Sequence, residues 1–288
     1  IGMAVLRAMA VYNVYLIVRY YHSKIAGIVS VAPMLVYPSF LFVHATVLRE
    51  VMVLFCLTTT ARLLLAPSKQ LGRVEQYIIA GISLCVAGIL REENIPVYIF
   101  ILAIVVFVKW KPWKKYEILT ELGTLTGTFV GLVGIYIYGH QVLDRLMTIR
   151  RYRARGRTEY LGSIFPETIP TATAFSWIGA MYFLFSPFPW MVANIMDFVI
   201  MLEALGNLSY TIAAILGAKI VAQKTPAGAV ALVTGILVGS VLYGLGTANV
   251  GTAVRHRQMI TWAIFLLGGI GIASCVQFNT NNIYNRRT

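Results

Sequence analysis

The sequence predicts an all-α, polytopic transmembrane helical bundle of about 9–11 helices with an amphipathic interfacial segment. Of its 288 residues, 58% are hydrophobic and only 12% are charged, whereas about 25% of the residues of a soluble domain are charged. The mean hydropathy is +0.75, and the apolar runs approach the length that a helix needs to cross the hydrocarbon core. This pattern excludes a soluble domain, a disordered chain and the short alternating strands of a membrane barrel.

The apolar runs, bounded by charged or turn residues, give the expected order of the spans within one integral-membrane domain covering residues 1–288. They are residues 3–20, 25–47, 51–66, 74–90, 95–108 and 118–138, then an external basic loop over 139–173, a broken interfacial region over 174–205, and spans over 208–222, 227–245 and 259–276. We expect Pro33 and Pro38 to bend the second span, because proline lacks the N–H that a helix interior requires.

The segment from 139 to 205 departs from simple spans. Val142, Leu146 and Ile149 share one helical face of the loop, which predicts a helix lying on the membrane surface. Pro187 and Pro189 are expected to end a helix near the external interface. Residues 174–205 are too few to provide two crossings of about 20 residues each, so we expect no two complete spans there.

The lysines and arginines divide between the two faces of the predicted bundle. Lysines 109, 111, 114 and 115 form the densest cluster, which the positive-inside rule places in the cytoplasm. Alternation of the spans then puts all eight lysines on that face and ten arginines, without a lysine, on the other. Because arginine binds phosphate and carboxylate bidentately, this split indicates an external anion-binding face. The alternative is that these arginines pair with lipid phosphates.

Two charged clusters begin or end predicted spans on the arginine-rich face. Arg49 and Glu50 precede one span, and Arg91, Glu92 and Glu93 follow another. Adjacent opposite charges are costly at membrane depth unless they are paired or used, so both clusters are candidate functional residues. The alternative for Glu50 is a structural role, since an acid in the first turn stabilises a helix.

The third cluster runs from Asn249 to Arg257, and we expect it to form an external turn between two apolar helices. Its glycine would let the backbone close around an anion bound by Arg255 and Arg257. His256 lies between two arginines, so like charge disfavours its protonation and leaves a neutral imidazole as a candidate base. The alternative is a solvated turn anchored at the lipid headgroups.

Further along the chain, Trp190 offers an aromatic ring at interface depth. Asp197 and Glu203 are acids in an apolar stretch, which makes them functional candidates, although a helix end at the interface would also account for Glu203. The three cysteines, at positions 56, 85 and 275, lie in apolar runs without ligand spacing, so we expect no disulfide framework and no metal site. The chain starts inside an apolar stretch without methionine, and we expect the natural protein to extend upstream.

Several motifs together resemble a group of multi-pass envelope proteins described as glycosyltransferase-like or oligosaccharide-polymerase-like, including protein-mannosyltransferase-like and O-antigen-polymerase-like families. The motifs, in order, are Pro38-Ser39-Phe40, Leu48-Arg49-Glu50, Leu90-Arg91-Glu92-Glu93-Asn94, Phe185 to Trp190 and Asn249 to Arg257. The resemblance implies glycan transfer from a polyprenyl phosphate or pyrophosphate carrier on the non-cytoplasmic face. It also implies a catalytic acid in an early external loop, which is either upstream of this sequence or replaced by Glu50, Glu92 or Glu93.

The leading hypothesis is therefore a membrane glycan transferase or polymerase that needs no metal or other cofactor. Its expected catalytic residues are Glu50, Glu92 and His256, and its expected substrate- and phosphate-binding residues are Arg49, Arg91, Arg255, Arg257, Asn249 and Trp190. Expected partners are membrane lipids, the polyprenyl-linked glycan and other membrane subunits, but not nucleic acid. Two other classes stay open: a transporter or flippase of lipid-linked sugars, and a structural subunit whose arginines dock an acidic partner.

Overall fold

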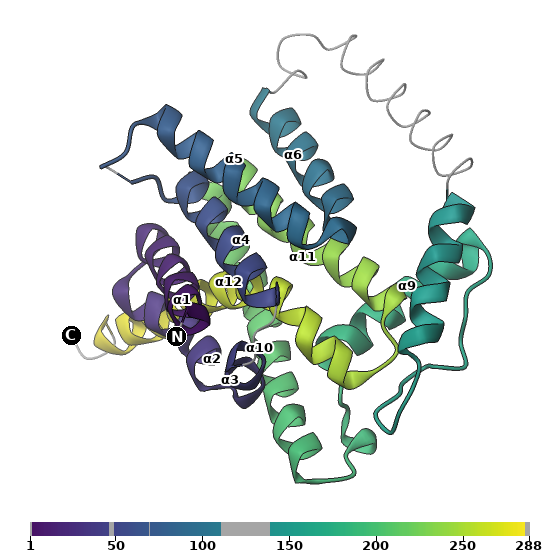
Figure 1. Ribbon diagram of the computed structural model, residues 1–288. Helices are drawn as coiled ribbons and strands as arrows, with labels where there is room; N and C mark the ends of the chain where they lie inside the picture. The colour runs from purple at the N-terminus through teal and green to yellow at the C-terminus, as the bar shows by residue number, and fades with distance from the viewer. Residues whose placement is uncertain (1, 46–48, 69, 111–138, 286–288) are drawn as a thin grey trace.

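The computed structural model describes residues 2–45, 49–68, 70–110 and 139–285, which form helices joined by short connections (Figure 1). No strand occurs in these ranges; a single isolated β-bridge pairs Glu159 with Asn249. The predicted all-α helical bundle is therefore confirmed. The expected span over 118–138 lies outside the described residues.

The helices follow the apolar runs of the sequence. In chain order they are α1 (Gly2–Tyr21), α2 (Lys24–Val36), α3 (Pro38–Ala45), α4 (Arg49–Leu65), α5 (Arg73–Leu90), the 3-10 turn η1 (Glu92–Asn94), α6 (Ile95–Trp110), α9 (Ile169–Phe185), the 3-10 turn η2 (Pro189–Met191), α10 (Ile195–Lys224), α11 (Pro226–Gly246) and α12 (Val250–Asn285). In the described part of the chain, α1, α5, α10, α11 and the first 27 residues of α12 are long and apolar enough to cross a membrane. This is the pattern of a multi-pass membrane protein.

The expected second span is two helices rather than one bent helix. Pro33 stays inside α2, but Tyr37 is extended (φ −64°, ψ 120°) and separates α2 from α3. A residue before proline is disfavoured in the helical region because the proline ring meets its backbone, so Pro38 begins a new helix instead of bending the old one.

The break expected over 174–205 is confined to residues 186–194. The prediction that Pro187 and Pro189 end a helix is confirmed, since α9 stops at Phe185. The expected boundary between 205 and 208 is wrong, because α10 continues through it as one helix of 30 residues. A glycine inside a helix costs only about 1 kcal/mol, and Gly206 lets the hydroxyl of Tyr37 approach where a Cβ would overlap it.

The expected amphipathic helix forms over residues 139–153. Leu143, Met147 and Arg150 are buried, and the two apolar residues pack against α9 and α11. Val142, on the face expected to lie against the membrane surface, is 54% exposed. Arg150 fixes the rotation of this helix about its own axis, because its guanidinium group donates to five backbone carbonyl oxygens of the neighbouring segments.

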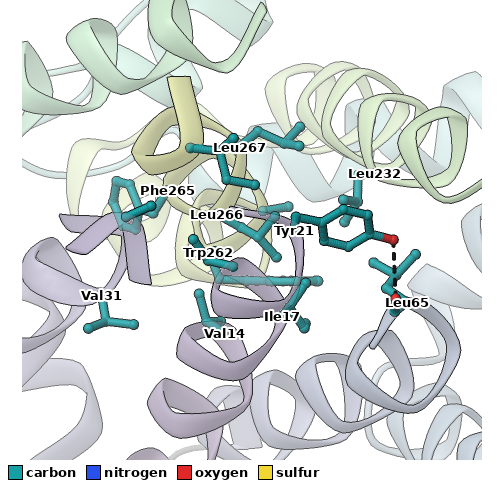
Figure 2. Close-up of a cluster of buried hydrophobic side chains, with 14 of the residues drawn as sticks. Val14, Ile17, Tyr21, Val31, Leu65, Leu232, Trp262, Phe265, Leu266 and Leu267 are labelled. Atoms are coloured by element: carbon teal, nitrogen blue, oxygen red, sulfur yellow. Dashed lines mark hydrogen bonds between the residues drawn. The ribbon is translucent and has the colours of Figure 1, made fainter. Parts of the chain in front are cut away.

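Helix α12 lies at the centre of the bundle and is packed by α1, α2, α4 and α10 (Figures 1 and 2). Figure 2 shows Trp262, Phe265, Leu266 and Leu267 of α12 among apolar side chains of α1, α2, α4 and α11. Glycines 217, 268 and 271 bring α10 and α12 so close that a Cβ there would overlap the backbone of the partner helix. Close backbone approach at small residues is how membrane helices gain packing energy without water.

The two ends of the bundle differ in their charged residues. At one end the Lys224 ammonium group donates to the carbonyl oxygens of Tyr20 and Tyr21 (3.3 and 3.0 Å), and the Tyr21 hydroxyl donates to the Leu65 oxygen (3.1 Å). The end of α1, the end of α4 and the α10–α11 turn therefore meet at this end. The candidate site lies at the start of α4 and of α12, which is the opposite end.

Candidate functional site

Glu50 is the centre of the candidate site. It lies in the first turn of α4 and is 0% exposed. Its Oε1 accepts a hydrogen bond from Nη2 of Arg91 and another from Nε of Arg255, the latter at 2.6 Å. The arginines lie 41 and 205 residues from Glu50 in the sequence, so the fold joins two of the charged clusters with the start of α12. A buried carboxylate is tolerated only when it is paired in this way.

Arg91 links this carboxylate to a second one. It caps the end of α5, is buried, and donates from Nη1 to Oε1 of Glu93 at 2.8 Å. Burial acts to raise the pKa of the Glu93 carboxyl, but hydrogen bonds from its own backbone N–H and from Arg91 outweigh it and lower that pKa. Glu93 is therefore an anion at neutral pH, and its side chain is 48% exposed.

Arg153 is a third guanidinium group near this site, and the sequence analysis does not single it out. It ends the helix over 139–153 and donates to the Gly246 oxygen at 3.3 Å. Burial lowers the pKa of Arg153, Tyr243 and Glu93 oppose this, and the positive charges of Arg91 and Arg255 lower it further. The charges of all three arginines therefore act on one another.

We call Glu50, Glu93, Arg91, Arg153 and Arg255 the arginine cluster. Three positive and two negative charges give it a net charge of +1. Arg255 has a 39% exposed side chain, and among the described residues only its Nε is engaged in an ion pair. Its two Nη groups are thus available to a ligand, which gives the cluster the chemistry of an anion-binding site.

A set of uncharged polar side chains underlies the cluster. The Tyr243 hydroxyl donates to Oδ1 of Asn94 (2.8 Å), and Nδ2 of Asn94 donates to the Tyr98 hydroxyl (3.2 Å). The ring of His256 lies 5.2 Å from the ring of Tyr243. His256 is buried, and its Nδ1 has no hydrogen-bond partner among the described residues. It faces the interior of the bundle, whereas Glu93 faces the exterior.

Arg257 does not join the arginine cluster. It is buried and donates from Nη1 to the carbonyl oxygens of Leu184 and Ser186, at 3.3 and 2.7 Å. These carbonyls end α9, where no further turn of helix satisfies them. A positive charge is also favourable at a helix C-terminus, so Arg257 stabilises the break after α9.

The expected external turn over 249–257 is wrong, because α12 already begins at Val250. Asn249 starts the helix: its Oδ1 accepts from the Gly251 N–H (2.9 Å), and its Nδ2 donates to the Arg155 oxygen (2.8 Å). Asparagine is a preferred residue at this position, since its side chain satisfies a free N–H of the first turn. The structure thus gives Asn249 a structural role at the start of α12.

The remaining candidates lie outside the cluster. Arg49 and Glu92 are exposed, and neither forms an ion pair with a described residue. Trp190 is 72% exposed and stacks on Phe188 with ring centroids 4.8 Å apart. That geometry suits a ring at a membrane interface.

Each of the two acids in the apolar stretch binds a residue that is distant in the sequence. Asp197 is held bidentately by Arg157, at 2.7 and 3.1 Å, which ties the start of α10 to the loop after residue 153. Oε1 of Glu203 accepts from the Ser39 N–H at 2.9 Å and so satisfies the start of α3.

Arg150 is a further buried guanidinium group that the sequence analysis does not single out. It is fully buried and donates to the carbonyl oxygens of residues 161, 164, 244, 245 and 247. It therefore fixes the end of α11 and the loop before α9, one helical turn before Arg153. The spacing of three residues between Arg150 and Arg153 is the sequence signal that both lie on one buried face.

Comparison of the chain with protein-family models, curated proteins and solved structures finds no match. Within the described residues no group of histidine, cysteine, aspartate and glutamate is arranged to hold a metal ion.

Proposed function

We propose that this chain is an integral membrane glycan transferase or polymerase acting on polyprenyl-phosphate-linked sugars at the non-cytoplasmic face. The observation that carries the proposal is the meeting of Arg91 and Arg255 on one buried carboxylate. Such a meeting is the geometric condition for two distant arginines to bind the same phosphate. The net charge of +1 and the available Nη groups of Arg255 support an anionic ligand.

Glu50 is a positioning residue in this proposal rather than the base. Two guanidinium groups favour the charged form of its carboxylate, and they occupy the oxygen that faces them. Such a carboxylate is a weak proton acceptor, but it fixes the planes of Arg91 and Arg255. Arginine planes held in advance stabilise a developing charge without reorganising at the moment of reaction.

The reaction is a displacement at the anomeric carbon of the lipid-linked sugar. The acceptor hydroxyl oxygen forms the new bond to that carbon, and the bond from the carbon to the phosphate oxygen breaks. The electron pair of the broken bond stays on the phosphate oxygen, where Arg91, Arg153 and Arg255 offset its charge. Glu93 also pairs with Arg91, but with one guanidinium group instead of two, and its side chain is half-exposed. It is therefore the carboxylate of the cluster that an acceptor can reach, and in this proposal it takes the hydroxyl proton.

The location of the basic residues supports the orientation. Lys224 and the α1–α2 turn lie at the end of the bundle opposite the cluster. In our proposal the lysine-rich end faces the cytoplasm, so the cluster lies on the outer side. Cysteine labelling, described in the Discussion, tests this directly.

The binding test uses purified protein in lipid nanodiscs with a long-chain polyprenyl phosphate as the probe. One charge-assisted bond contributes about 1.5–3 kcal/mol, so Arg255→Lys, which keeps the charge but loses the fork, should raise Kd about 10- to 150-fold. Arg49→Lys, an exposed arginine beside Glu50, should leave Kd unchanged. Equal affinities for wild type and Arg255→Lys would refute the phosphate-binding role.

The transfer test measures glycan transfer in membranes for Arg91→Lys, Arg255→Lys and the exposed control Arg145→Lys. We expect the first two to lose activity and the control to keep it. Carrier binding and carrier translocation without transfer would favour a flippase of lipid-linked sugars. Absence of carrier binding by the wild type would leave a structural subunit of an envelope assembly as the better hypothesis.

A further inference from the structure

An apolar groove runs along the bundle beneath the arginine cluster. It lies between α4, α6, α11 and α12 and encloses about 230 Å³. Its walls are mostly aliphatic side chains, such as Leu57 and Leu64 of α4, Ile101 and Val105 of α6, and Leu232 and Ile236 of α11. We propose that this groove, named here the α6 groove, binds the hydrocarbon chain of the polyprenyl carrier; the inference rests on the proposed function.

The two ends of the α6 groove lie at the two ends of the bundle. Asn94 and Tyr243 line it at one end, and Lys109 and Thr225 line it at the other. Asn94 directly precedes α6 and Lys109 lies near its end; they are 15 residues apart, which at 1.5 Å per residue is about 22 Å. Thr225 directly precedes α11, and Tyr243 lies 18 residues later, or about 27 Å by the same rise.

The length of the α6 groove determines which kind of hydrocarbon chain fits it. The hydrocarbon core of a bilayer is about 30 Å thick, so each acyl chain of a phospholipid occupies about 15 Å of it. A groove of 22–27 Å exceeds one leaflet. It therefore fits a single long chain that passes the bilayer midplane, which a polyprenyl chain does and a phospholipid acyl chain does not.

The end of the α6 groove that is lined by Asn94 and Tyr243 lies beside the arginine cluster. The Asn94 N–H donates to the Arg91 carbonyl oxygen at 3.0 Å, and the Asn94 side chain accepts from Tyr243. Both residues line the groove. A phosphate held by Arg91 and Arg255 thus has the mouth of an apolar groove beside it, which matches an anionic headgroup joined to a long apolar chain.

Glycines of α11 set the width of the α6 groove. Gly228, Gly235 and Gly239 line it. A Cβ added at Gly235 would lie 3.4 Å from Cδ1 of Ile101, on the opposite wall. An alanine therefore fits at this position, whereas a leucine has to extend into the groove and displace part of any chain bound there.

The test compares two phosphates that share a headgroup but differ in chain length, a long-chain polyprenyl phosphate and geranyl phosphate, in nanodiscs of phosphatidylcholine. Gly235→Leu should weaken long-chain binding at least about tenfold, since two displaced methylene groups already correspond to that factor. Geranyl phosphate should bind both proteins within about twofold of each other, because its chain of two isoprene units ends before Gly235, which lies eight residues or about 12 Å along α11 from Tyr243 at the mouth. Gly235→Ala and Gly81→Leu, a glycine on α5 with open space around it, should resemble wild type with both probes.

Three results would overturn the inference: no change for either probe, equal loss for both, or equal wild-type affinity for dioleoyl phosphatidate and the polyprenyl phosphate. If Gly235→Leu does not fold, Ile101→Trp obstructs the same part of the groove from the other wall and takes its place. Failure of the proposed function has a different signature, since Arg255→Lys would then leave the binding of geranyl phosphate unchanged.

Discussion

Replacing Glu50 with glutamine tests the buried ion pairs of the arginine cluster. The change keeps the shape of the side chain but leaves Arg91, a buried guanidinium, without its main counter-charge. Breaking a buried ion pair from one side costs about 3–5 kcal/mol. We expect the lower end, about 3 kcal/mol, because Arg91 keeps Glu93 and the half-exposed Arg255 can be hydrated.

The assay is denaturant unfolding in detergent micelles, with Arg49→Gln as the control for an exposed charge at the same helix start. The control should stay within about 0.5 kcal/mol of wild type. The double variant Glu50→Leu/Arg91→Met should lose less stability than Glu50→Gln, since apolar groups of similar size replace a buried pair at little cost. A loss below about 1 kcal/mol for Glu50→Gln, or a greater loss for the double variant than for Glu50→Gln, would refute the buried pairing.

Three further predictions concern the rest of the bundle. Burial, and secondarily the charge of Lys224, lower the pKa of His22 below its usual value of about 6.5. As the pH falls, the unfolded chain takes up the proton first, so the stability is full above about pH 6.5 and decreases below it. Thermal unfolding measured from pH 8 to pH 5 should therefore show a steeper loss of stability in the wild type than in His22→Gln. Cysteines at Gln70 and Glu92, with the natural cysteines replaced, should be labelled by an impermeant reagent from opposite sides, and labelling from one side would refute the orientation. Gly217→Ala should destabilise the α10–α12 crossing, whereas Gly81→Ala, with no neighbour within 4 Å, should stabilise by about 0.5–1 kcal/mol in unfolding assays.

Most of the helices follow from apolar runs alone, because a helix is the structure that satisfies every backbone group of a segment in lipid. The boundaries that fail are those set by contacts between helices. Nothing near Gly206 indicates that α10 continues, since the contact with Tyr37 comes from α2 and α3, more than 150 residues earlier. Arg150 is a similar case, because its carbonyl partners on α11 are about a hundred residues away.

The sequence indicates the cluster only in part, and the helical phase of α12 explains the difference. In an external turn, Arg255, His256 and Arg257 could converge on one anion. In a helix, residues two positions apart point about 200° apart, so Arg255 reaches Glu50 while Arg257 reaches the end of α9. From the sequence alone, the approach of Arg91 to Arg255 is only a condition that phosphate binding would have to meet. The spacing of residues along the chain does not determine which helix ends lie together in the fold.

The arginine cluster is a poor way to stabilise a membrane helix bundle. A buried ion pair adds little stability over well-packed apolar residues of the same size, and the core around α12 shows that this chain packs apolar helices closely without charges. Charges at membrane depth are therefore best explained by a ligand that needs them. The groove reaches the cluster through Asn94, which lines it and donates to the Arg91 carbonyl oxygen. We therefore propose a ligand with an anionic head, bound by the cluster, and one long hydrocarbon chain, bound by the groove. If Arg255→Lys changed only stability and not carrier affinity, the cluster would instead be a docking surface for an acidic partner protein.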